Sequence, residues 1–179
     1  AAKPLPHEPR PVAVLSATAR ILIAGQAPGL RVHETGIPFN DASGDRLRGW
    51  LSVTRAQFYD PANFAILPMG FCFPGYDTHG SDLPPRGECA PLWRRRALDA
   101  MPQIELVLAV GGYAQRWHLG EAMAATMTET VHGWRSHMER GVLPLPHPSW
   151  RNTGWLRKNP WFEAELLPEL RSKVSRWIS

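Results

Sequence analysis

A polar loop after a buried-looking strand contains the first residues that could do chemistry. The loop GQAPGLRVHETGIPFNDASGDRL (25–47) follows the apolar run ARILIA and is much longer than a chain reversal requires. Gly25 and Gly29 would let the backbone approach a ligand closely, and the N–H groups of Gln26 and Ala27 could then bind an acceptor oxygen. An ordinary strand-to-loop turn is the alternative, since the stretch matches neither GxGxxG nor a P-loop.

A second loop, HPSWRNTGW (147–155), carries the next candidate group. A histidine between a strand and a rigid proline can point its ring into a crevice. A neutral imidazole of His147 could there donate a hydrogen bond to a developing anion. The alternative is a surface loop that happens to contain a histidine.

The spacing of other reactive residues disfavours two further chemistries. A metal site could use His33, Asp41 and His147, but no HExxH or similar short-range pair is present, so we expect no metal. A serine nucleophile would be Ser43 or Ser149, but neither lies in a GxSxG elbow.

Composition predicts one globular domain over residues 1–179, with a proline-rich, irregular arm at 1–18. The net charge of +4 and a pI near 9.5 weakly favour an anionic partner, and some of the eight tryptophans could stack on bases. Cys72 and Cys89 form no CxxC motif. No apolar run approaches 18 residues and no signal-like stretch opens the sequence, so we expect a soluble, cytoplasmic protein.

Strands and helices are predicted to alternate along the chain. Asp41 or Ser43 could cap the first helix, and Pro168 should kink or split the last one. This order predicts an α/β fold, with a four-stranded, mostly parallel sheet between two helical layers. The carboxyl ends of such strands share one crevice, so the two polar loops should meet there. The expected strands are 20–25, 64–70, 105–112 and 141–149, and the expected helices are 43–58, 89–101, 113–127 and 159–178.

The two loops together resemble the signature motifs of the uracil-DNA glycosylase superfamily. GQAPG, followed by TGIPF, resembles the first motif, and HPS near the end of the last strand resembles the second. PFNDASGDRL and HPSWRNTGW are most similar to the iron–sulfur-associated bacterial and archaeal branches. The resemblance implies a three-layer αβα sandwich and a monomeric, bacterial, monofunctional DNA glycosylase of base-excision repair. Its partner would be DNA containing a deaminated base, uracil first, and it would need no cofactor.

The resemblance implies a role for each residue around a flipped base. Phe39 would stack on the base, while the backbone N–H groups of Gln26 and Ala27 would contact its carbonyl oxygen. His147 would bind the same oxygen as negative charge builds up. A core position is the alternative for Phe39.

Two candidates would act on the sugar side. Asp41, which matches the Asp of the D-x-SG stretch, would hold the attacking water and face the sugar cation. His33 could serve instead. Asp41 could alternatively do no more than cap a helix.

The last loop is implied to contact the DNA itself. Trp150 or Arg151 would fill the gap left by the flipped base, and Asn152 would orient the loop or touch the base. Ser149, with Arg157 or Lys158, would hold flanking phosphates, with a solvated surface charge as the alternative for each basic residue. The run WRRR (93–96) is expected on a helix face away from the crevice.

Three departures from the family pattern stand out. The spacing of Cys72 and Cys89 resembles the second pair of cluster cysteines, but the first pair is missing, so we predict no iron–sulfur cluster and two cysteines near each other in the core. Pro68 and Met69 stand where a base-reading asparagine is usual. Ala27 stands where the best-known branch has a water-activating aspartate.

These departures leave rival functions open. One is a glycosylase for another deaminated base, such as hypoxanthine or xanthine. A second is a catalytically weak DNA-binding module with the same pocket, and a third is a nucleotide or small-molecule enzyme on a similar sheet.

Overall fold

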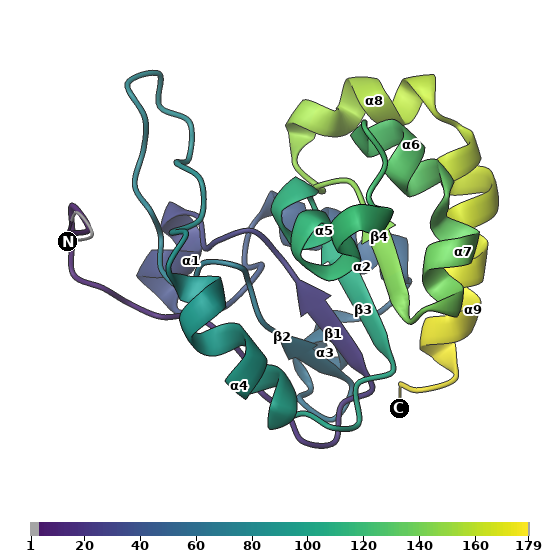
Figure 1. The fold of residues 1–179 in the computed structure, drawn as a ribbon, viewed down its shortest axis with the longest axis horizontal. Coiled ribbons are helices and arrows are strands. Elements are labelled where there is room, and N and C mark those ends of the chain that lie inside the picture. Colours follow the sequence, from purple (N-terminus) through teal and green to yellow (C-terminus); the bar gives the residue numbers. More distant parts are fainter. Residues whose placement is uncertain (1–3, 179) are drawn as a thin grey trace.

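The protein is built on a four-stranded parallel sheet (Figure 1). The structure, a computed structural model, describes residues 4–178. The strand order is β2-β1-β3-β4, and Ile21 of β1 lies opposite Phe64 on one side and Leu106 on the other. All four predicted strands are therefore confirmed, and so is their parallel pairing. The strands are β1 (Ile21–Ala24), β2 (Phe64–Ile66), β3 (Leu106–Val110) and β4 (Val142–Leu145).

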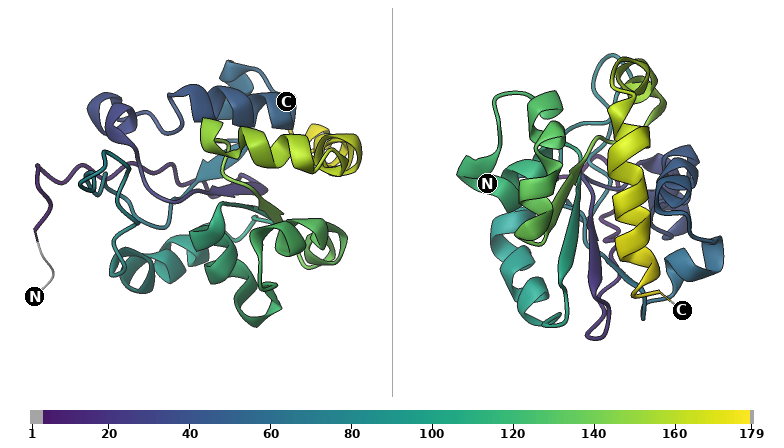
Figure 2. Two further views of the ribbon diagram at one scale, coloured as in Figure 1. Left: turned by 90° about the horizontal axis from the view of Figure 1, so that it is seen from above. Right: turned by 90° about the vertical axis from the view of Figure 1, so that its right-hand side faces the viewer.

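Helices cover both faces of the sheet and make the predicted three-layer arrangement (Figure 2). The layer on one face contains α1 (Leu30–Thr35), α2 (Ala42–Leu51), α3 (Arg55–Tyr59), α8 (Thr153–Lys158) and α9 (Leu167–Ser175). The other layer contains α4 (Arg95–Asp99), α5 (Gly112–Leu119), α6 (Met127–His132) and α7 (Trp134–Glu139). Short π-helical segments, Ala90–Arg94 and Phe162–Leu166, lead into α4 and α9.

Alternating side chains along the strands fill separate apolar clusters on the two faces of the sheet. Ile21 and Ile23 are fully buried in the larger cluster with α2, α3 and α9, while Leu22 and Ala24 are fully buried against the α4 and α5 side. Successive side chains of a strand point to opposite faces, so a strand covered on both faces must be apolar throughout. This is why the short runs could be recognised as strands from the sequence.

The predicted helix 43–58 is two helices in the structure. Ser52 adopts a left-handed conformation (φ 56°) and ends α2. Thr54 then starts α3 with a capping box, in which its side chain accepts a hydrogen bond from the Gln57 N–H and the Thr54 N–H donates to the Gln57 side chain. The apolar spacing continues across this break, so the pattern alone could not show it.

Other helix boundaries also differ from the prediction. The helix predicted at 113–127 ends at Leu119, because Gly120 turns the chain with φ +52°. The short helices α1, α6, α7 and α8 were not predicted. Pro168 lies in the first turn of α9, directly after the π-helical segment, so the chain changes its helical hydrogen-bonding there without losing helical structure.

The N-terminal arm lies along the edge of the sheet. Between residues 4 and 18 the only strand-like pairing is an antiparallel bridge of Val14 with Ile66 of β2. The Val12 N–H also donates to the Phe71 carbonyl (2.8 Å), and His7 Nε2 bonds the Phe73 carbonyl (2.8 Å). The Val14 bridge pairs part of the β2 edge, and the other two bonds join the arm to the segment that follows β2. Among the helices of residues 4–178, none has the length and apolar character needed to cross a membrane.

Candidate active site

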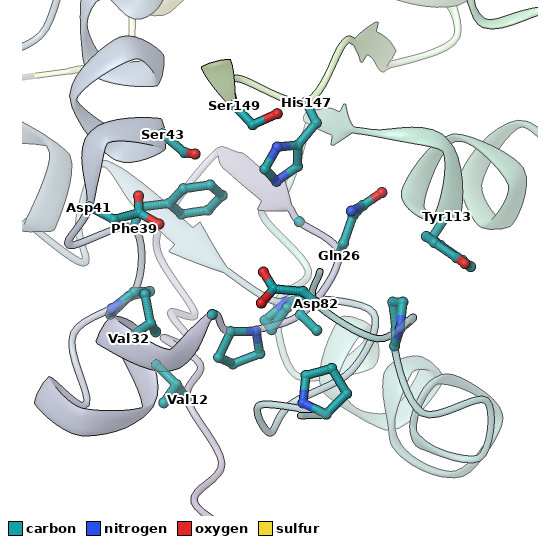
Figure 3. Close-up of a pocket in the computed structure, with 18 of the residues that line it drawn as sticks. Val12, Gln26, Val32, Phe39, Asp41, Ser43, Asp82, Tyr113, His147 and Ser149 are labelled. Atoms are coloured by element: carbon teal, nitrogen blue, oxygen red, sulfur yellow. The ribbon is translucent and has the colours of Figure 1, made fainter. Parts of the chain in front are cut away.

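A cavity of about 550 Å³ lies at the carboxyl ends of the strands. Its walls come from the loops after β1, β2 and β4, with Tyr113 at the start of α5 (Figure 3). The volume is typical of a small-molecule or nucleobase-sized site. The two polar loops singled out from the sequence therefore do meet. The cavity is lined by the predicted residues Gln26, Ala27, Phe39, Asp41, His147, Ser149, Trp150, Arg151 and Asn152.

Phe39 belongs both to the core and to the cavity wall. Its ring packs edge-on against Phe58, with the ring centroids 6.1 Å apart, and a Cβ added at Gly25 would lie 3.2 Å from its Cζ. Its backbone has φ 52°, a left-handed conformation rare for a bulky residue. The surroundings hold it there: the Phe39 carbonyl accepts a hydrogen bond from Arg48 Nη1 (3.3 Å), and the Tyr59 hydroxyl donates to the Pro38 carbonyl (2.9 Å).

Asp41 caps a helix and also lines the cavity. Its Oδ1 accepts a hydrogen bond from the Gly44 N–H (2.9 Å) and caps α2, as the helix-cap alternative required. The same side chain lines the cavity. Ser43 lines the cavity too but does not cap the helix.

The backbone of the GQAPG turn faces the cavity with free donors. The carbonyls of Gly25 and Gln26 accept hydrogen bonds from the N–H groups of Met69 (2.9 Å) and Gly70 (2.8 Å), which ties the turn to the end of β2. Within residues 4–178 the N–H groups of Gln26 and Ala27 donate to no protein acceptor. They are therefore available to an acceptor oxygen of a ligand.

His147 is positioned to act as a neutral donor. Burial lowers its pKa below the ordinary histidine value, and the charge of Arg151 lowers it further, against an opposing effect of Asp41. The imidazole is therefore neutral at pH 7 and carries one N–H. The Asn152 amide donates to the His147 carbonyl (2.7 Å) and so fixes the backbone that carries the ring.

Two arginines hold the last loop in place. Arg46 of α2 donates to the Ser149 carbonyl (2.9 Å) and to the Thr153 hydroxyl (3.2 Å). Arg151 donates to the Ser81 hydroxyl (3.2 Å), which joins this loop to the one after β2. Trp150 is 75% exposed at the mouth of the cavity.

His33 does not line the cavity, unlike Asp41 and His147, the other two catalytic candidates. It lies on α1, where its ring contacts His7 edge-on, with centroids 4.6 Å apart, and lies 6.0 Å from the ring of Phe73. The helical turn of α1 directs it toward the N-terminal arm. Because α1 was not predicted, the direction of this side chain could not be foreseen.

Sequence analysis missed Asp82 and Tyr113, which also line the cavity. Burial raises the pKa of the Asp82 carboxyl, the charge of Asp41 raises it further, and Arg151 opposes this rise. Asp82 follows β2, so the rule that ligands bind beyond the carboxyl ends of the strands could have pointed to its loop. Pro68 lines the cavity wall, as expected for the position without a base-reading amide.

The cysteines do not fit a four-cysteine cluster. Cys72 and Cys89 are both free and partly exposed, and they are the two cysteines of the chain. Burial raises the pKa of Cys72, and the neighbouring Cys89 raises it further. In the described part of the chain, no three His, Cys, Asp or Glu side chains are grouped so that they could hold a metal ion. The absence of a cluster remains a prediction.

The fold and the site define a class of protein: an α/β protein with a ligand cavity beyond the carboxyl ends of a parallel sheet, furnished with neutral and backbone donors. A family model described as the uracil DNA glycosylase superfamily matches residues 12–171, and the chain belongs to this superfamily. The resemblance seen in the two loops is thereby confirmed. Membership supports a DNA glycosylase-type enzyme of base-excision repair that acts on DNA.

Proposed function

We propose that the protein is a monofunctional DNA glycosylase that hydrolyses the N-glycosidic bond of a flipped, deaminated base, with uracil as its first substrate. One observation carries the proposal. Phe39, His147 and the unpaired N–H groups of Gln26 and Ala27 line the same cavity, although more than a hundred positions separate the first two. An aromatic face beside several donors suits a planar base with a carbonyl oxygen.

The donors stabilise the leaving base. When the C1′–N bond breaks, its electron pair goes to the base, and negative charge gathers on the carbonyl oxygens. The neutral imidazole of His147 and the backbone N–H groups then donate more strongly than they do to the bound substrate. Donors that strengthen in the transition state are worth about 10²–10³ in rate each. No cofactor is needed for this chemistry.

Asp41 acts on the other side of the broken bond. Its carboxylate faces the oxocarbenium-like sugar and holds the water whose oxygen attacks C1′. Its bond to the Gly44 N–H keeps the side chain in one rotamer, which supports a positioned role. His33 has no part in this scheme, because it does not line the cavity.

The loop 149–152 contacts the DNA. Trp150 fills the space left by the flipped base, a role supported by its exposure, whereas Arg151 is already bonded to Ser81. Asn152 orients the loop through its bond to the His147 carbonyl. Ser149, Arg157 and Lys158 contact flanking phosphates.

A second candidate function is a glycosylase for hypoxanthine or xanthine. The observation that favours it is Pro68, which lines the cavity where a base-reading asparagine is usual. A proline side chain cannot distinguish base edges by hydrogen bonding.

The test is a panel of single- and double-stranded DNA molecules, each with one uracil, hypoxanthine or xanthine. Abasic product is revealed by alkaline cleavage under single-turnover conditions. We expect release of uracil, and His147→Ala should lower its rate by about 10²–10³. Release of another base without uracil would favour the second candidate. Tight DNA binding without any abasic product would indicate a binding module instead.

A further inference from the structure

We propose that Asp82 is a second catalytic carboxylate of this cavity, and that it accepts the proton of the attacking water beside Asp41. The assignment rests on the proposed glycosylase function. Asp82 lines the same cavity as Asp41 and His147, and in Figure 3 its carboxylate lies between the side chains of Gln26 and Asp41. It comes from the loop between β2 and α4, which projects from the body of the protein (Figure 1).

The loop holds residue 82 in a defined place. Tyr76 and Asp82 form an antiparallel bridge, and the Leu83 N–H donates to the Gly75 carbonyl (2.9 Å). At the tip, the Asp77 carboxylate accepts hydrogen bonds from the N–H groups of His79 (2.8 Å) and Ser81 (2.9 Å). The hydrogen bond from Arg151 to Ser81 then joins this hairpin to the loop after β4. A catalytic side chain needs such a fixed backbone.

The Asp82 carboxylate is free to take a ligand or a proton. In the described residues no side chain or backbone group donates a hydrogen bond to it, and no cation lies within ion-pair distance. Asp41 differs, because its Oδ1 is already committed to the cap of α2. Asp82 therefore has both carboxylate oxygens available, whereas one oxygen of Asp41 is already occupied.

Asp82 lies near two features of the cavity, the GQAPG turn and Asp41. One carboxylate oxygen lies 3.7 Å from the position of a Cβ at Gly29, past the donors of the GQAPG turn. The charges of Asp41 and Arg151 both act on its pKa, and Arg151 lies at the mouth. The residue is itself exposed toward solvent. Asp82 is therefore open to water beside Asp41, the residue proposed to face the sugar cation.

The proposed step balances without a further reactant. The C1′–N bond breaks and the base leaves with the electron pair. The oxygen of the water forms a bond to C1′ of the sugar cation, and one proton of that water passes to the Asp82 carboxylate. The proton then exchanges with solvent, and the base anion is protonated by water.

The test compares Asp82→Asn with Asp99→Asn. Asp99 is an exposed carboxylate at the end of α4, close to the amino end of β3, whereas the cavity lies at the carboxyl ends of the strands. The control variant therefore removes the same charge far from the cavity. Single-turnover rates on the base released by the wild type are measured from pH 4 to 9. Affinity for DNA with an abasic site and the thermal unfolding of each variant are measured in parallel.

We expect Asp82→Asn to lower the rate about 100-fold or more at pH 7, with folding intact and DNA affinity unchanged or increased. Wild-type activity should fall in acid, and the part of this fall that is due to protonation of Asp82 should be missing from the variant. Asp99→Asn should match the wild type. An Asp82→Asn rate within about threefold of wild type, or a loss confined to DNA affinity, would overturn the role of Asp82 alone. A wild type that releases no base at all would overturn the proposed function, and this role with it.

Discussion

Gly44 is the position where a single added carbon should disturb the site most directly. A Cβ built there lies 1.7 Å from the carbonyl oxygen of Phe39 and 2.9 Å from its Cβ. Gly44 is in the first turn of α2, and Phe39 is the proposed stacking residue in a left-handed conformation. Gly44→Ala must therefore push the Phe39 backbone away from its present place. Gly49, in the same helix, has nothing within 4 Å of the equivalent position.

The expected cost follows from the contacts that must move. The carbonyl has to retreat from 1.7 Å to at least 3.0 Å, and overpacking of this kind costs about 1–3 kcal/mol. The Arg48 hydrogen bond to that carbonyl is worth about 0.5–1.5 kcal/mol, and the Asp41 cap about 1 kcal/mol. Replacing glycine by alanine in a helix returns about 1 kcal/mol. We expect Gly44→Ala to lower the free energy of unfolding by about 1.5–4.5 kcal/mol.

Thermal unfolding of the two variants gives the measurement. For a chain of this length, Gly44→Ala should lower the Tm by roughly 5–15 °C, whereas Gly49→Ala should raise it by a few degrees. Base release by Gly44→Ala should also fall at temperatures where the variant is folded, because Phe39 is displaced. A Tm for Gly44→Ala equal to or above that of the wild type would refute the reasoning, since it would mean that the loop 38–41 adapts at no cost.

Three further predictions test the site and its support. Asp41→Asn should keep the cap of α2 and the Tm but lose most activity, whereas Asp41→Ala should also lose about 1 kcal/mol of stability. Equal activity of Asp41→Asn and wild type would count against the catalytic role of Asp41. Trp150→Ala should weaken binding to abasic DNA about 5–150-fold with an unchanged Tm, measured by fluorescence anisotropy. Burial, with the charge of Arg94, lowers the pKa of His118 to about 3, whereas its pKa in the unfolded state is near 6.5. Between these two pH values the unfolded state binds more protons than the folded state, so the free energy of unfolding, measured in urea, should fall as the pH drops from 6.5 toward 3. The fall should be smaller in His118→Asn.

The sheet is the part of the fold that local sequence predicts best. The four strands are apolar at almost every position because both faces are covered, and this pattern is visible without any structure. The parallel order follows from helices between strands, and it places the ends of β1 and β4 at one edge. The meeting of Phe39 and His147 in one cavity could therefore be predicted from the topology.

Arg94 shows where local pattern fails. The run WRRR was expected on a helix face away from the crevice, and none of its four residues lines the cavity, but the pattern gave no sign that Arg94 would be fully buried. It donates to the carbonyls of Leu67 (2.9 Å) and Pro68 (3.1 Å), and to His118 Nε2 (2.7 Å), and burial lowers its pKa to about 10. These partners lie more than twenty positions away in sequence, so no local pattern indicates that Arg94 would contact them. Only the packing of the folded chain decides these contacts.

The sequence by itself determined the positions of the four strands along the chain, the parallel sheet and the edge at which chemistry could occur, because these depend on apolar periodicity and on short motifs. Tertiary structure alone decided which polar side chains face the cavity. The turn of α1 directs His33 toward His7, while the hairpin after β2 brings Asp82 to Asp41 and Arg151. Side-chain direction in a loop is set by hydrogen bonds to distant segments, and no local pattern in the chain records those partners.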